Sequence, residues 1–133
     1  MMIRTFHVAI LLTSLILLIT SSTITYASDK PDISKVGFVL YTKSSAPGTL
    51  NARWMYGNKY RGSGIATGGP REGYAGSYHV RYFLENGDFS DEYDLVIEKV
   101  GDIFEVSWLT DEELKAVGVG MEVESGLAVG WYH

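Results

Sequence analysis

The chain has no cysteine among its 133 residues. It therefore has no disulfide framework, no thiolate metal site and no cysteine nucleophile. A small domain without such cross-links must be held together by burial of its core alone. A closed β-barrel of this size can meet that requirement.

Basic residues are also scarce. Residues 1–27 contain one of the 11 Lys and Arg residues and none of the 16 Asp and Glu residues, so the rest of the chain has a net charge of −6. Neutralisation of phosphates by Lys and Arg supplies most of the affinity for nucleic acids, and this part of the chain contains no basic cluster that could provide it. We therefore expect no nucleic-acid partner and no attraction to an anionic membrane surface once residues 1–27 are removed.

Catalytic motifs are missing as well. The sequence contains neither a Gly-x-Ser-x-Gly nucleophile elbow nor a His-Glu-x-x-His zinc motif. Its neighbouring acidic residues fall in predicted turns or at strand ends, where solvated carboxylates are the ordinary outcome. We expect a protein that is not an enzyme and that needs no cofactor.

The N-terminus resembles a cleavable export signal. Arg4 precedes an apolar stretch over residues 8–19, and small residues lie before a predicted cleavage site after Ala27. The apolar stretch is shorter than the roughly 20 residues that a membrane-spanning helix needs. We therefore expect residues 1–27 to be a signal peptide and the protein to be periplasmic or extracellular.

The remaining chain alternates between segments of strand character and turn signals. Residues 28–35 are polar and are predicted to form a flexible lead-in to a domain over residues 36–133. Asn86-Gly87 is the strongest hairpin signal. A short helix over 111–117 is an alternative that we reject, because Gly118 and Gly120 follow at once. Eight strands are expected, at residues 36–43, 49–56, 59–67, 75–84, 92–100, 103–109, 113–119 and 127–133.

An internal repeat relates the two halves of this domain, at about residues 36–84 and 91–133. A shift of 54 residues superimposes five identical pairs without gaps, which are Trp54/Trp108, Gly64/Gly118, Gly76/Gly130, Tyr78/Tyr132 and His79/His133. Two four-stranded halves that close on each other remove their exposed edges. The predicted fold is an all-β, eight-stranded antiparallel up-and-down barrel built from two four-stranded repeats. Glycines inside strands, such as Gly64 and Gly118, indicate a bulge, a bend or a close approach.

The size, the eight-strand meander and the export signal resemble the calycin group of lipocalin-like and avidin-like barrels. The segment from Gly101 to Tyr132, with its glycine and tryptophan spacings, also resembles small exported bacterial proteins of unknown activity, some of them labelled fibronectin-binding. The Gly-x-Trp opening of true lipocalins is missing. The resemblance therefore implies an architecture and no functional residue.

The best candidates for a binding site are the aromatic residues. Most of them can be core residues and cross-strand pairs, or some can line an open barrel and bind a small molecule. Under the second interpretation Trp54 and Trp108 would face each other across the cavity. The candidate ligand-binding residues are Trp54, Trp108, Trp131, Tyr78, Tyr82 and Tyr132. His79 and His133 could hold a metal, but a solvent-facing histidine and a terminal one are the simpler interpretation.

Two functions are compatible with this sequence. The first is an exported, non-enzymatic binding protein that holds a small apolar or amphipathic ligand inside the barrel. The second is a surface-binding module or inhibitor of a protein partner, such as a cell-wall hydrolase or a host matrix protein. Its contacts would come from the loops at residues 44–48, 68–73 and 122–126. An open barrel interior would favour the first function, and a filled interior would favour the second.

Overall fold

The computed structural model describes residues 32–132. A single 3-10 turn, η2, precedes eight strands. The bounds are η2 Ile33–Lys35, β1 Val36–Lys43, β2 Leu50–Tyr56, β3 Tyr60–Thr67, β4 Gly76–Leu84, β5 Phe89–Val100, β6 Ile103–Thr110, β7 Glu113–Val123 and β8 Gly126–Tyr132. The expected signal peptide and half of the expected lead-in, residues 28–31, lie outside the described residues. Within residues 32–132, no helix has the length and apolar character needed to cross a membrane.

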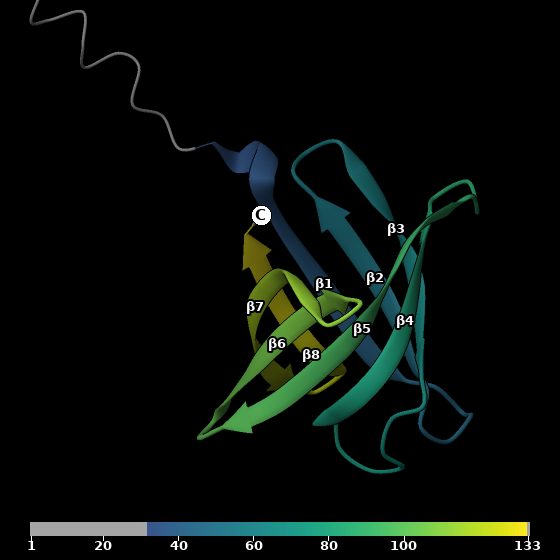
Figure 1. Ribbon diagram of the computed structural model, residues 1–133, viewed down its shortest axis with the longest axis vertical. Coiled ribbons are helices and arrows are strands. Elements are labelled where there is room, and N and C mark those ends of the chain that lie inside the picture. Colours follow the sequence, from purple (N-terminus) through teal and green to yellow (C-terminus); the bar gives the residue numbers. More distant parts are fainter. Residues whose placement is uncertain (1–31, 133) are drawn as a thin grey trace, which may run out of the picture. The chain divides into compact units, whose positions relative to one another are not determined.

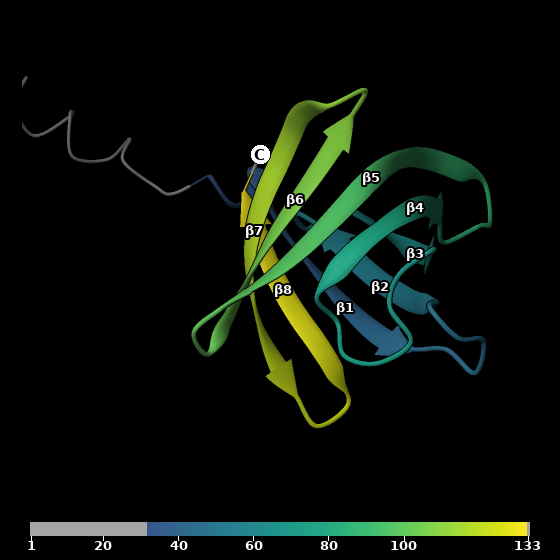
Figure 2. The same cartoon turned by 60° about the horizontal axis from the view of Figure 1, so that its bottom comes forward.

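The strands form a closed antiparallel barrel in which each strand pairs with its neighbours in the chain and β8 returns to β1. Figures 1 and 2 show this order as a colour sequence from blue β1 around to yellow β8. The predicted all-β, eight-stranded up-and-down barrel is confirmed, and the architecture is consistent with a calycin-like fold. The rejected helix over residues 111–117 is replaced by a hairpin turn and the start of β7.

The prediction of a loop at residues 122–126 is wrong. Strand β7 continues to Val123 and pairs there with Gly126, so only residues 124 and 125 form the turn. The predicted strand ended at residue 119, whereas β7 runs on past two glycines, Gly118 and Gly120. The cross-strand ladder holds them in extended geometry nonetheless, because β8 supplies partners along the whole of β7.

The interior follows the two-residue alternation of the strands. The half of the barrel that contains the β1–β2, β3–β4, β5–β6 and β7–β8 connections is filled by apolar side chains. Leu50, Leu95, Ile97 and Leu127 are among the fully buried residues there. The barrel is therefore solid at this end, which we call the closed end.

Small residues on the inner wall make room for the aromatic rings. A Cβ added at Gly37 would lie 2.3 Å from the indole of Trp131, and one at Gly64 would lie 2.7 Å from the ring of Tyr82. Of the roles expected for a glycine inside a strand, Gly64 therefore has that of a close approach. Pairing large with small inward residues is how a narrow barrel accommodates its side chains.

Candidate functional site

The other end of the barrel, with the β2–β3, β4–β5 and β6–β7 hairpins, is hollow. It contains a cavity of about 500 Å³, which lies in the range that holds small-molecule ligands. Most of the wall is aromatic, and the polar side chains are few. The lining residues are Val39, Trp54, Tyr56, Tyr60, Tyr82, Leu84, Ser90, Asp91, Tyr93, Trp108, Lys115, Ala116 and Trp131.

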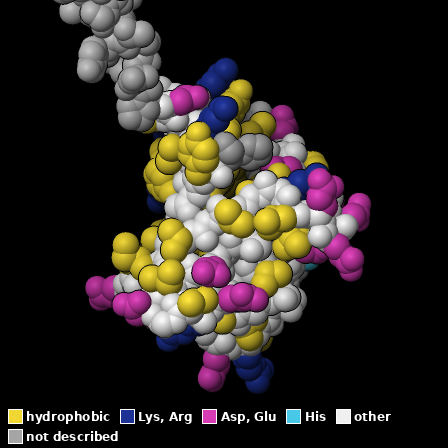
Figure 3. Space-filling view, turned by 60° about the vertical axis from the view of Figure 1, so that its left-hand side comes forward, with side chains coloured by type: hydrophobic (Ala, Val, Ile, Leu, Met, Phe, Trp, Pro, Cys, Tyr) yellow, Lys and Arg dark blue, Asp and Glu magenta, His cyan; other side chains and the backbone are white. Residues whose placement is uncertain are grey.

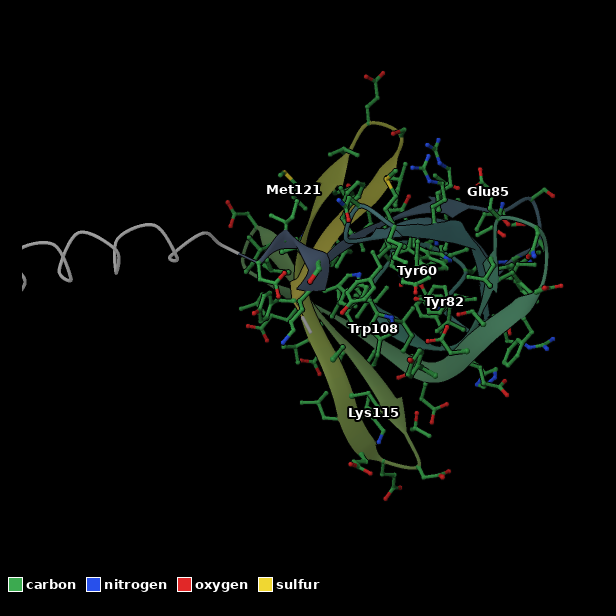
Figure 4. All side chains as sticks on the ribbon, turned by 90° about the horizontal axis from the view of Figure 1, so that it is seen from above. Tyr60, Tyr82, Glu85, Trp108, Lys115 and Met121 are labelled. Atoms are coloured by element: carbon green, nitrogen blue, oxygen red, sulfur yellow. The ribbon has the colours of Figure 1, made fainter. Side chains whose placement is uncertain are left out.

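A hydrogen-bonded group of three aromatic side chains lies at the floor of the cavity; Tyr82 and Trp108 line the cavity, and Tyr41 is fully buried. The Trp108 indole Nε1 donates to the Tyr82 hydroxyl at 2.8 Å, and that hydroxyl shares a hydrogen bond with the Tyr41 hydroxyl at 2.5 Å. Figure 4 looks into the ring of strands and shows Tyr60, Tyr82 and Trp108 within it. Since these polar atoms bond to one another, the floor presents mainly ring surface to a ligand.

Two more tryptophans complete the aromatic wall. Trp54 Nε1 is 2.9 Å from the Ser63 carbonyl oxygen, to which it donates, and its ring meets Tyr82 edge-on at 6.4 Å between centroids. The Trp131 ring stacks on Tyr56 at 4.9 Å and 6°. Gly37 pairs with both residues of that stack, and its missing side chain leaves the space that the Trp131 indole occupies.

Two irregularities in the ladder place polar groups at the mouth of the cavity. Between β4 and β5 the pairing skips Ser90, and between β6 and β7 it skips Lys115. Strict alternation would point both side chains outward, because Glu92 and Val117 face solvent on the same strands. A bulge re-aims a side chain, and both residues contribute to the cavity wall.

Asp91 and Tyr93 add a second polar feature at the mouth. The Tyr93 hydroxyl donates to Asp91 Oδ2 at 2.5 Å. Desolvation, reinforced by this carboxylate, raises the pKa of Tyr93, and burial raises the pKa of Tyr82 to about 12. Both phenols are therefore neutral at physiological pH and act as hydrogen-bonding groups.

Four of the six predicted ligand-binding residues line this cavity, namely Trp54, Tyr82, Trp108 and Trp131. Trp54 and Trp108 come from β2 and β6, which lie half a turn of the barrel apart. The other two lie elsewhere. Tyr78 is buried toward the closed end, where its hydroxyl donates to the Tyr74 carbonyl oxygen at 2.8 Å. Tyr132 is 63% exposed on the outer surface.

Sequence reasoning missed several lining residues. Tyr93 could have been found by alternation, since it shares the inward face of β5 with Leu95 and Ile97. Alternation in β8 also indicates that Trp131 and Tyr132 cannot both point inward. Ser90 and Lys115 gave no such signal, because a bulge position is not visible in the alternation of apolar residues.

The 54-residue shift superimposes inward residues on inward residues in β2 and β6, where Leu50, Ala52 and Trp54 match Phe104, Val106 and Trp108. The correspondence ends at Tyr78 and Tyr132, one of which points inward and the other outward. The two-repeat origin of the barrel thus stays a prediction.

The other predicted features lie away from the cavity. His79 faces solvent between Glu92 and Asp94, with its Nε2 2.8 Å from Glu92 Oε2. His133 lies outside the described residues, and residues 32–132 contain no cluster of metal-ligating side chains. The connections at residues 44–48, 68–73 and 124–125 are all at the closed end.

Comparison of the chain with protein-family models, with curated proteins and with solved structures found no match.

Proposed function

We propose that this protein is an exported, non-enzymatic binding protein that holds a small amphipathic ligand in the open half of the barrel. The observation that carries the proposal is the cavity of about 500 Å³, whose wall is mostly aromatic and whose few polar groups lie at the mouth. Apolar pockets with a small number of oriented polar groups are typical of ligand sites. The calycin-like architecture and the signal-like N-terminus agree with a carrier that works outside the cytoplasm.

The arrangement of polar groups implies an orientation for the ligand. On the floor, the Tyr82, Tyr41 and Trp108 polar atoms already have partners. A ligand group that competed for them would leave one of them unsatisfied, which costs about 1–3 kcal/mol. At the mouth, Ser90, Asp91 and Lys115 can receive polar atoms. The apolar end of the ligand therefore enters first and its polar end stays at the mouth.

The chemistry of the cavity favours binding over catalysis. Its phenols have raised pKa values, so they are poor general bases at neutral pH. Lys115 lies 3.3 Å from Glu113 Oε2, and its side chain is 41% exposed. The tyrosines and the lysine can hold and orient a ligand.

The first test is native mass spectrometry of the protein exported by a bacterial host. An added mass that is lost on denaturation identifies the natural ligand, and N-terminal sequencing of the same sample should start at Ser28. A chain that still begins at Met1 would contradict the export signal.

A fluorescent probe tests the position of the site. Anilinonaphthalene sulfonate is aromatic with one polar end, and its emission should rise in the wild-type protein. Ala116→Phe fills part of the cavity, and we expect it to weaken binding of the probe at least tenfold. Ile65→Phe introduces the same side chain on the outer face of β3 and serves as the matched control. Equal affinity in both variants would refute a site in the cavity and favour a protein that acts through its surface.

A further inference from the structure

The wall of the cavity is a connected set of aromatic rings. The ring of Tyr82 lies 6.4 Å from that of Trp54 and 6.2 Å from that of Tyr93, measured between centroids. The Trp108 indole donates to the Tyr82 hydroxyl, and its ring lies 6.2 Å from that of Trp131. Aromatic faces carry partial negative charge and attract cations that come within about 6 Å of the ring centroid. Such a wall suits a positively charged group better than a negatively charged one.

Three N–H and O–H donors on this wall are already engaged within the protein. Trp54 Nε1 donates to two backbone carbonyl oxygens, at 2.9 and 3.2 Å. The Trp108 indole donates to the Tyr82 hydroxyl, and the Tyr93 hydroxyl donates to Asp91. An anionic group would need such donors, whereas a protonated amine brings donors of its own.

Asp91 is the carboxylate on the cavity wall. None of the Lys, Arg and His side chains in residues 32–132 forms an ion pair with it. Its charge also acts inside the cavity. Burial is the larger cause of the raised pKa values of Tyr82 and Tyr93, and the Asp91 carboxylate adds to both. A carboxylate without a cationic partner beside an aromatic wall is a suitable counter-ion for a protonated amine.

Lys115 is the basic residue of the wall, and its charge has a partner. Its ammonium nitrogen lies 3.3 Å from Glu113 Oε2. In Figure 4, Lys115 lies on the β6–β7 hairpin, apart from Tyr82 and Trp108. Long basic side chains cover apolar surface with their stems while the charged end lies in water. The pair with Glu113 leaves Asp91 as the unmatched charge at the mouth.

The three hairpin turns around the mouth are acidic. The β2–β3 turn carries Lys59, the β4–β5 turn carries Glu85 and Asp88, and the β6–β7 turn carries Asp111 and Glu112. One lysine against four carboxylates gives these turns a net charge of −3. Figure 3 shows that acidic side chains also predominate over basic ones on one face of the molecule. Charge of one sign around a cleft raises the local concentration of ligands of the opposite sign.

We propose that the ligand of this cavity is a cationic amphiphile, a protonated amine on an apolar body, with its ammonium group at Asp91 and its apolar end on the floor. The inference rests on the proposed function, because it names the class of ligand for the same cavity. The apolar end meets the rings of Tyr82 and Trp108, whose polar atoms bond to each other. A carboxylate or sulfate at the head of the ligand would instead bring a negative charge next to Asp91 and the acidic turns.

Isothermal titration calorimetry with three small probes tests the head group. Octylammonium, octanol and octanoate have unbranched chains of nearly the same length and differ in the charge at one end. We expect the exported protein to bind octylammonium about tenfold more tightly than octanol, because the ion pair and the aromatic rings both favour the cation. Octanoate should bind most weakly. Equal affinity for octylammonium and octanol, or a preference for octanoate, overturns the inference.

Asp91→Asn tests the position of the counter-ion. Asparagine keeps an oxygen that can accept from the Tyr93 hydroxyl and removes only the charge. We expect the affinity for octylammonium to fall about fivefold and the affinity for octanol to stay unchanged. Asp102→Asn removes the same charge from the β5–β6 turn at the closed end and serves as the matched control. An equal effect of the two variants would indicate general attraction to an acidic protein and overturn the assignment to Asp91.

Lys115→Gln tests the other charge at the mouth. We expect this variant to bind octylammonium at least as tightly as the wild type does, because it removes a positive charge and leaves Glu113 without its partner. A lower affinity for octylammonium would contradict a cationic head group at this end of the cavity.

The outcomes distinguish this inference from the proposed function. If octanol binds to the wild type and not to Ala116→Phe, the cavity remains the binding site whatever the head-group preference. If none of the three probes binds, the proposed function and this inference both fail. The natural ligand found by native mass spectrometry gives an independent check: an amine supports the inference, and an acid or a neutral molecule overturns it.

Discussion

The hydrogen-bonded floor of the cavity gives the sharpest prediction about stability. Tyr82 is 7% exposed, Trp108 is 5% exposed, and Tyr41 is fully buried. Tyr82→Phe removes the one oxygen that bonds to both of the other side chains. Tyr41→Phe removes only the bond between the two hydroxyls and leaves the bond from the Trp108 indole intact.

The expected magnitudes follow from the number of buried polar groups that lose a partner. Each costs about 1–3 kcal/mol. Tyr82→Phe leaves the Trp108 indole N–H and the Tyr41 hydroxyl without this partner, so we expect a loss of about 3 kcal/mol. Tyr41→Phe leaves one hydroxyl with one bond fewer, so we expect a loss of about 1 kcal/mol. For a domain of this size, a difference of 2 kcal/mol lowers the melting temperature by roughly 8–16 °C.

Urea unfolding followed by circular dichroism measures both variants against the wild type. The double variant Tyr82→Phe/Tyr41→Phe should be less destabilised than the sum of the single variants, because with both hydroxyls gone only the indole N–H is unpaired. Equal losses in the two single variants would refute the reasoning, since they would show that the bond to the indole contributes nothing. Strict additivity would refute the coupling of the two hydroxyls.

Three further outcomes are expected. A tyrosine in the unfolded chain titrates near pH 10, whereas burial raises the pKa of Tyr82 in the folded protein to about 12. The contribution of Tyr82 to the free energy of unfolding should therefore be intact below pH 10 and fall by about 3 kcal/mol between pH 10 and 12. Urea unfolding at a series of fixed pH values measures this loss. The hydrogen bond to Glu92 raises the pKa of His79 above 6.5, so NMR titration should show Glu92→Gln lowering that pKa; an unchanged value would contradict the ion pair. Gly37→Ala should cost about 1–3 kcal/mol in thermal unfolding because its Cβ meets an indole ring, whereas Gly130→Ala has open space around it and should cost less than 0.5 kcal/mol.

The sequence by itself determined the number and order of the strands and most of the side chains that point inward. Alternation is a local property with a period of two, so Trp54, Tyr82 and Trp108 could be assigned to the interior from their own strands. The hairpin at Asn86-Gly87 was predictable for the same reason, because turn geometry depends on neighbouring residues. These local rules gave the correct strand number and the correct topology.

Only the tertiary structure decided how high along the barrel each inward residue lies. Tyr78 and Tyr82 share a face of β4, yet one lies toward the closed end and the other lines the cavity. That height depends on the stagger between neighbouring strands, which is a property of the closed barrel. The two bulges that direct Ser90 and Lys115 toward the mouth are likewise features of strand pairs. A single strand carries no record of its partner's register, so the polar part of the candidate site could not be found from the sequence.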